Sequence, residues 1–114
     1  MDLAAKLQLR PGQQIRVVNA PPDLVLDLAT TTEPDAGPIL LFVRSGADLA
    51  EQAHLAIAAA LAGRPAWIAY PKAGQLGTDL NRDRVWKPLL EHGIRPIRQV
   101  SIDGTWTALR FRPA

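Results

Sequence analysis

The sequence predicts an α/β domain in which a mostly parallel sheet carries helices on both faces and ends in an antiparallel β-hairpin. Short apolar runs alternate along the chain with segments whose apolar residues recur at helical spacing, as in strand–helix–strand units. Residues 39–43 are apolar without interruption, which is typical of strands buried on both faces of a parallel sheet. Asp103 and Gly104 separate the last two strand-like runs, and this dipeptide is a strong hairpin signal. We therefore expect a single-domain Rossmann-like three-layer sandwich over residues 1–114.

The N-terminal half is predicted to alternate helices with short strands. Residues 2–9 have the apolar spacing of a short amphipathic helix, and the β-branched run 15–18 predicts a strand. A second helix is expected over residues 22–28, because the proline at its start suits a first helical turn, where no N–H donor is needed. Residues 30–32 are all threonine and predict an edge strand or an extended segment.

The C-terminal half is predicted to continue the alternation and to finish in the hairpin. An alanine-rich helix is expected over residues 47–61, with Ser45 or Asp48 as its N-cap. Gly63 is well placed to end this helix. Pro88 falls inside the next helix and predicts a kink or a restart there, because proline lacks an N–H donor. The remaining elements are expected as a strand at 67–70, a helix that begins near residue 79, and strands at 97–102 and 106–111.

The composition indicates a soluble globular protein. Of the 114 residues, 47% are hydrophobic and 21% are charged, and a chain of this length can bury a substantial core. The absence of cysteine excludes disulfides, thiolate metal sites and a cysteine nucleophile, and it fits a cytoplasmic protein. The first residues lack the pattern of a signal peptide, and no apolar run approaches the ~20 residues that span a bilayer. We expect a cytoplasmic protein that does not enter the membrane.

The charge is distributed unevenly between the two halves. Residues 1–57 carry 4 basic and 7 acidic side chains, whereas residues 58–114 carry 9 basic and 4 acidic ones, for a net charge of +2 overall. A basic half can attract a phosphate or a nucleic acid. The plainer interpretation is that the basic side chains solvate outward faces of helices and strands, and we do not expect nucleic acid as the partner. The side chains concerned are Arg84, Lys87, Arg95, Arg98 and Arg110.

Polar side chains gather just beyond the strand predicted at residues 67–70. The chain breaks at Pro71, crosses a glycine-containing loop and enters a helix with a polar first turn. Because ligands of open α/β sheets bind outside the carboxyl ends of the strands, this loop is the predicted site. Lys72 and Arg82 would grip an anion there, helped by free N–H donors at the helix start. The candidate ligand-binding residues are Tyr70, Lys72, Thr78, Asp79, Asn81, Arg82, Asp83 and Trp106.

The same residues also fit purely structural roles. Thr78 or Asp79 is a natural helix N-cap, and Asp83 can pair with a neighbouring cation. Catalytic chemistry has weaker support, because the sequence contains no G-x-S-x-G motif. His54 and His92 are far apart, so no metal site is expected. Both interpretations of the loop stay open.

Two resemblances to known families follow from longer stretches of the chain. The segments 9–18 and 59–70 resemble parts of the class I methyltransferase-like Rossmann fold. Such enzymes need a glycine-rich turn after the first strand so that the backbone can approach the cofactor, as dinucleotide-binding folds do. The corresponding turn here, residues 18–23, contains no glycine and two prolines. The resemblance therefore implies a minimal or degenerate methyltransferase at most, and no cofactor is assigned.

The second resemblance covers nearly the whole chain. Y-P-K at 70–72, T-D-L-N-R-D at 78–83 and D-G-T-W-T-A-L-R-F at 103–111 are similar to the motifs of a small bacterial family of unknown function. The chain departs from that family at Thr107, where serine is expected, and in carrying the single Lys72 where two lysines often occur. Membership implies a fold and no activity.

On these grounds we expect a non-catalytic module that binds a small anionic ligand or a protein partner at residues 70–83. Two alternatives stay open: a minimal methyltransferase-like enzyme, and a weak nucleic-acid or phosphate binder. A homodimer is also left open, because the exposed edge of a small sheet can pair with a second copy.

Overall fold

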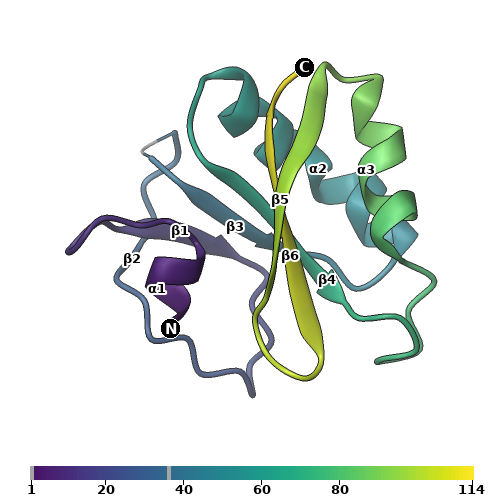
Figure 1. Cartoon of the computed structure of the whole chain (residues 1–114), viewed down its shortest axis with the longest axis horizontal. Helices are drawn as coiled ribbons and strands as arrows, with labels where there is room; N and C mark the ends of the chain where they lie inside the picture. The colour runs from purple at the N-terminus through teal and green to yellow at the C-terminus, as the bar shows by residue number, and fades with distance from the viewer. Residues whose placement is uncertain (1, 36) are drawn as a thin grey trace.

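The computed structural model describes residues 2–35 and 37–114 and is built on one six-stranded mixed sheet (Figure 1). The strand order is β2-β1-β3-β4-β6-β5, with the first four strands parallel and β6 antiparallel to both of its neighbours. The predicted α/β class and the closing hairpin are confirmed. The strands are β1 (Ile15–Val18), β2 (Thr30–Thr31), β3 (Ile39–Phe42), β4 (Ala66–Pro71), β5 (Ile94–Ser101) and β6 (Trp106–Pro113); the helices are α1 (Leu3–Lys6), α2 (Gly46–Leu61) and α3 (Arg82–Leu90).

The two central strands are buried on both faces, as the unbroken apolar run of β3 predicts. Successive side chains of a strand point to opposite faces. Leu41 and Ile68 therefore pack on the side of α2 and α3, while Leu40 and Trp67 pack on the side of α1. Each face of the sheet has its own apolar core, and β3 and β4 contribute to both cores.

Helices α2 and α3 cover one face of the sheet. The Ser45 side chain caps α2 by accepting a hydrogen bond from the Asp48 N–H, so Ser45 is the cap among the two predicted candidates. Gly63 follows the end of α2 with a φ of 78°, a conformation that glycine adopts without strain. The cap of α3 is Asn81, not Thr78 or Asp79 as the sequence suggested. Pro88 lies within α3, which continues to Leu90 without a restart.

The opposite face has no full helical layer in the described part of the chain. Residues 22–28 were predicted to be helical, but the segment is extended apart from a turn at 22–23. Leu24, Leu26 and Leu28 pack on the core beneath α1, whereas Val25 between them is 93% exposed. This alternation has the period of two residues that characterises extended chain. The three-layer sandwich is therefore incomplete: its second outer layer is the four-residue α1 and this extended segment.

Both edges of the sheet are poorly suited to pairing with another strand. β2 has only two residues. β5 begins three residues before the predicted strand 97–102, and it contains Pro96 and a shift of register between Pro96 and Arg98. Proline, a bulge and short length all oppose edge-to-edge association. None of the described helices is both long and apolar enough to cross a membrane.

Candidate functional site

Polar residues that follow several strands lie at one edge of the sheet. Arg44 and Ser45 follow the last residues of β3, and Lys72 follows β4. Because β6 runs antiparallel to β4, its first residue, Trp106, lies opposite Pro71 at the same edge. We call this the carboxyl edge, meaning the carboxyl ends of the parallel strands together with the start of β6.

The loop between β4 and α3 is fastened to the start of α2. The Thr78 hydroxyl donates to the Arg44 carbonyl oxygen over 2.7 Å and accepts from the Leu80 N–H over 3.0 Å. Asp79 Oδ1 accepts from the Gly46 N–H over 2.9 Å, and Asp79 Oδ2 lies 3.1 Å from the place where a Cβ would stand on Gly46. An N–H group at a helix start is a natural anion-binding donor. Here the protein's own carboxylate occupies it.

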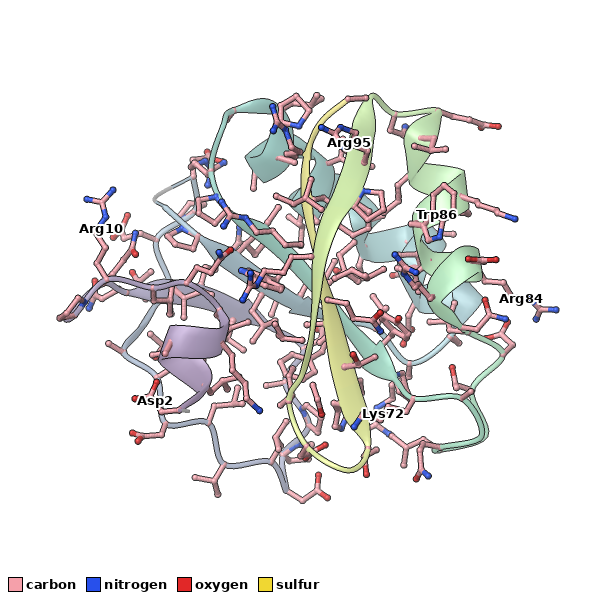
Figure 2. All side chains as sticks on the ribbon, viewed as in Figure 1. Asp2, Arg10, Lys72, Arg84, Trp86 and Arg95 are labelled. Carbon is pink, nitrogen blue, oxygen red and sulfur yellow. The ribbon has the colours of Figure 1, made fainter. Side chains whose placement is uncertain are left out.

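Most of the other predicted residues in this loop also have partners within the protein. Asn81 Oδ1 accepts from the Arg84 N–H over 2.9 Å. Asp83 accepts from Trp86 Nε1 over 3.0 Å, and its other oxygen lies 3.7 Å from Lys87 Nζ. The ammonium group of Lys72 donates to the Ser101 hydroxyl over 2.8 Å, next to the hairpin (Figure 2). These contacts match the structural interpretation of the loop.

Arg82 and Tyr70 complete the predicted set. Arg82 is exposed, and its side chain has no hydrogen bond or ion pair within the described residues. Tyr70 is only 2% exposed, and its hydroxyl accepts from Gln99 Nε2 over 3.2 Å. Burial raises the pKa of Tyr70; the Arg82 guanidinium opposes this rise and the Asp83 carboxylate adds to it. The Tyr70 phenol is therefore neutral at physiological pH, so it can donate or accept a hydrogen bond there but cannot act as a base.

The carboxyl edge also contains a cavity of about 230 Å³. The Arg44 guanidinium lies over the Trp106 indole, 6.0 Å from the ring centroid, and Phe42 supports that indole edge to face at 5.1 Å. Asp103 Oδ1 accepts from the Thr105 and Trp106 N–H groups, each over 2.8 Å, and so sets the shape of the adjoining turn. The lining residues are Pro21, Asp23, Leu24, Arg44, Leu76, Asp103, Thr105 and Trp106.

This cavity partly agrees with the predicted site. Trp106 was predicted to bind ligand and lines the cavity, and Leu76 belongs to the predicted loop. Asp23, Arg44 and Asp103 were not among the candidate residues. The sequence did place Arg44 directly after a buried strand, which is a usable signal. By contrast, Asp23 lies in the turn at residues 22–23, where the sequence predicted the first turn of a helix.

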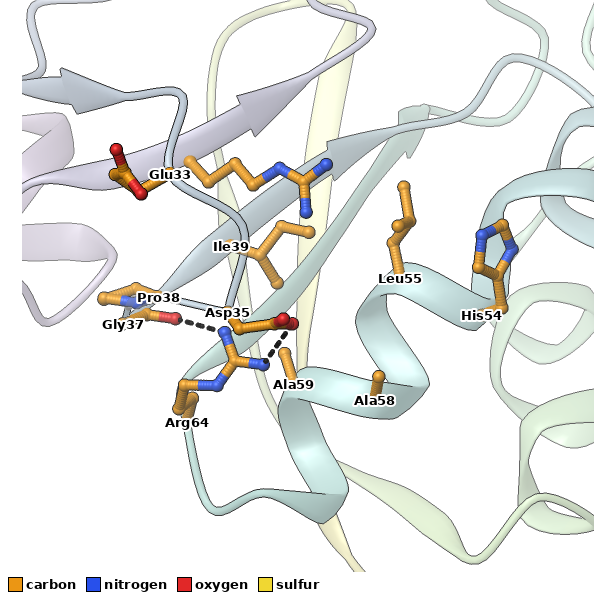
Figure 3. A pocket seen from close by; sticks show the side chains of 11 residues that line it. Glu33, Asp35, Gly37, Pro38, Ile39, His54, Leu55, Ala58, Ala59 and Arg64 are labelled. Carbon is orange, nitrogen blue, oxygen red and sulfur yellow. Dashed lines mark hydrogen bonds and ion pairs between the residues drawn. The ribbon is translucent and has the colours of Figure 1, made fainter.

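Two other hollows lie on the α2 side of the sheet. An apolar groove of about 680 Å³ runs between α2 and α3, with His54 and His92 among its lining residues. A smaller cavity of about 80 Å³ lies beside the loop that leads into β3 (Figure 3). There Arg64 donates to the Gly37 carbonyl oxygen over 3.1 Å and lies 3.6 Å from the Asp35 carboxylate, so its charge already has a partner. Within the described residues, no group of three potential metal ligands occurs.

Comparison with known proteins finds no matching family model, no similar curated protein and no similar solved structure. The two resemblances drawn from the sequence therefore stay predictions.

Proposed function

We propose that this protein is a non-catalytic binding domain whose ligand occupies the cavity at the carboxyl edge that Arg44 and Trp106 line. The observation that supports this most directly is the Arg44 guanidinium, which lies over the Trp106 indole and lines the same cavity. Neither of the two ion pairs in the described residues involves Arg44. Its position at the carboxyl ends of parallel strands is where open α/β sheets generally bind ligands.

The lining of the cavity defines the class of ligand. An unpaired guanidinium is suited to a carboxylate or a phosphate, which it can bind through two parallel hydrogen bonds. Asp23 and Asp103 add carboxylates that accept hydrogen bonds from hydroxyl or amino groups, and Leu24 and Leu76 add apolar walls. The cavity of about 230 Å³ corresponds to roughly eight waters at ~30 Å³ each. We infer a small acid that carries hydroxyl or amino groups.

A binding role fits these residues better than a catalytic one. The residues that line the cavity include Asp23 and Asp103 but no histidine or lysine. The two carboxylates therefore have no partner there for general acid–base catalysis. Lys72 is engaged with Ser101, and burial keeps Tyr70 in its neutral form. These contacts supply recognition groups without an activated nucleophile.

A methyltransferase-like enzyme is the second candidate, and one observation favours it. The antiparallel β6 is inserted between β4 and β5, two strands that run in the same direction, which agrees with a shortened methyltransferase-like Rossmann fold. Asn19 also has a φ of 60° directly after β1, the kind of conformation that a glycine-containing turn supplies. However, the described segment 19–29 contains no helix to present N–H donors to a cofactor. We therefore rank this candidate below simple binding.

A thermal-shift screen tests the proposal. The panel contains hydroxy acids, amino acids, sugar phosphates and S-adenosyl compounds. A ligand at 100 times its Kd stabilises the native state by about 2.7 kcal/mol. We expect a hit among the small acids that is lost in Arg44→Gln and kept in Arg10→Gln, whose side chain extends away from the protein (Figure 2). A hit among the S-adenosyl compounds alone would favour the second candidate, and a hit that survives Arg44→Gln would contradict the proposed site.

A further inference from the structure

Four arginines face one another across the β5–β6 ladder. Arg95 lies opposite Arg112, and Arg98 lies opposite Arg110. Val100 and Ala108, which pair two positions further along, belong to the core on the α1 side. Because side chains two apart on a strand share a face, Arg110 and Arg112 lie with Ala108 on the α1 side of the sheet. Their ladder partners, Arg98 and Arg95, lie on the same side. We call this set the arginine face; Arg95 marks its end near the start of β5 (Figure 2).

The positive charge of the arginine face is not balanced by the protein. Like charges directly opposite one another across a ladder are destabilising. Both ion pairs in the described residues, Arg64–Asp35 and Lys87–Asp83, lie elsewhere. Arg110 donates to the Gln8 side chain, which is neutral, and its Nε is buried without an acceptor. The arrangement therefore concentrates charge that an anionic partner would neutralise.

We propose that the arginine face binds the phosphate backbone of double-stranded nucleic acid. The partner has to be anionic over an extended surface, because three of the four arginines are exposed on a sheet face and line none of the three cavities described above. Guanidinium groups bind phosphates through paired hydrogen bonds, which lysine cannot do. Pairs of arginines two residues apart along β6 are separated by about 7 Å. A duplex carries one negative charge per about 1.7 Å of its axis, so several phosphates lie within reach.

The described side chains favour a duplex over other anionic partners. Single strands are usually held by stacking bases on exposed aromatic rings. Trp67, Trp106 and Tyr70 are buried, and Trp86 packs on the α2–α3 side of the sheet. A protein partner usually needs a buried aromatic or apolar anchor, and Ile97 is the only large apolar residue of β5 or β6 that is exposed. Backbone contact with a duplex requires neither feature.

The test measures binding of a fluorescent 20-base-pair duplex of arbitrary sequence at several salt concentrations. Four phosphate contacts give a slope of log affinity against log salt of roughly −3.6, which weakens binding roughly 150-fold between 50 and 200 mM salt. The double variant Arg98→Gln/Arg112→Gln should reduce the slope to about −1.8 and weaken binding at least tenfold at 50 mM salt. The control Arg10→Gln/Arg82→Gln removes the same charge from exposed positions elsewhere and should change affinity less than twofold.

Thermal melts of both double variants separate binding from folding. The arginine-face variant should melt no lower than wild type, because the substitutions relieve like-charge pairs. Equal losses in the two variants would overturn the proposal, since net charge alone would then explain binding. The proposal would also be overturned by a salt slope near zero or by the absence of duplex binding at 50 mM salt. Tighter binding of a single strand, polyglutamate or anionic vesicles than of the duplex would overturn it as well. This surface is separate from the cavity at Arg44, so either proposal can fail without the other.

Discussion

Asp79→Ala should destabilise the protein, because the Asp79 carboxylate accepts a hydrogen bond from the first N–H group of α2. The substitution removes the 2.9 Å hydrogen bond that Asp79 accepts from the Gly46 N–H. Loss of a comparable side-chain cap costs about 0.5–2 kcal/mol, and loss of a negative charge near an exposed helix start costs about 0.3–1 kcal/mol. We expect a total of about 1–2 kcal/mol, together with looser attachment of the loop before α3.

The expected loss is large enough for a thermal melt. At about 2.1 cal/mol/K per residue, a chain of this size has an unfolding entropy near 0.24 kcal/mol/K, so each kcal/mol lowers Tm by about 4 °C. Asp79→Ala should therefore lower Tm by about 4–8 °C. Asp79→Asn keeps an oxygen acceptor, so its Tm should fall by roughly half as much as that of Asp79→Ala. Asp27→Ala, which removes an exposed carboxylate from the extended segment after β1, serves as the control of equal charge change.

Sulfate provides a second readout of the same contact. Removing the Asp79 carboxylate leaves the Gly46 N–H free to bind an anion. Sulfate at constant ionic strength should then raise the Tm of Asp79→Ala more than that of wild type. If Asp79→Ala melts at the same temperature as Asp27→Ala and sulfate affects both equally, Asp79 does not stabilise the start of α2. The structural interpretation of this loop is then wrong.

Three further predictions concern other parts of the chain. Asn81→Ala should lower the free energy of unfolding by about 1 kcal/mol through loss of the α3 cap, whereas Arg82→Ala next to it should change it by less than about 0.5 kcal/mol in a denaturant titration. Burial raises the pKa of Tyr70, so the contribution of the neutral phenol to stability should be complete below about pH 10 and lost as the pH rises further. Between about pH 8 and 11 the melting temperature should therefore fall more steeply for wild type than for Tyr70→Phe. Equal slopes of melting temperature against pH would contradict this prediction. Arg112→Glu should pair with Arg95 across the ladder and stabilise the fold by about 0.2–1 kcal/mol, and a lower melting temperature for this variant would show that the paired arginines do not repel.

Local patterns in the sequence were sufficient to predict most strands and α2. The apolar run of β3 and the Asp103–Gly104 turn depend on neighbours along the chain, and both appear where expected. The prediction of a helix over residues 22–28 was wrong. Pro22 suggested a helix start, but Leu24, Leu26 and Leu28 alternate with exposed residues as in extended chain. An apolar residue at every second position indicates extended chain more strongly than a single proline indicates a helix start.

The site was harder to predict, because its contacts join distant parts of the chain. Asp79 reaches Gly46 across 33 positions and Lys72 reaches Ser101 across 29. No local pattern shows that these groups are already satisfied within the protein. The basic C-terminal half was visible in the sequence, but the register of β5 against β6 was needed to show which arginines lie opposite one another.

The most direct test of ligand binding at the carboxyl edge is an NMR titration that follows the indole N–H signals of the three tryptophans. Trp106 lines the cavity, Trp67 is fully buried in the core, and Trp86 packs on the α2–α3 side. With a small acid identified by the thermal-shift screen, the Trp106 signal should move in proportion to occupancy, while the Trp67 and Trp86 signals stay in place. Arg44→Gln should abolish the movement. A ligand that moves Trp86 and leaves Trp106 unchanged would contradict the account, because it would place binding on the opposite side of the sheet.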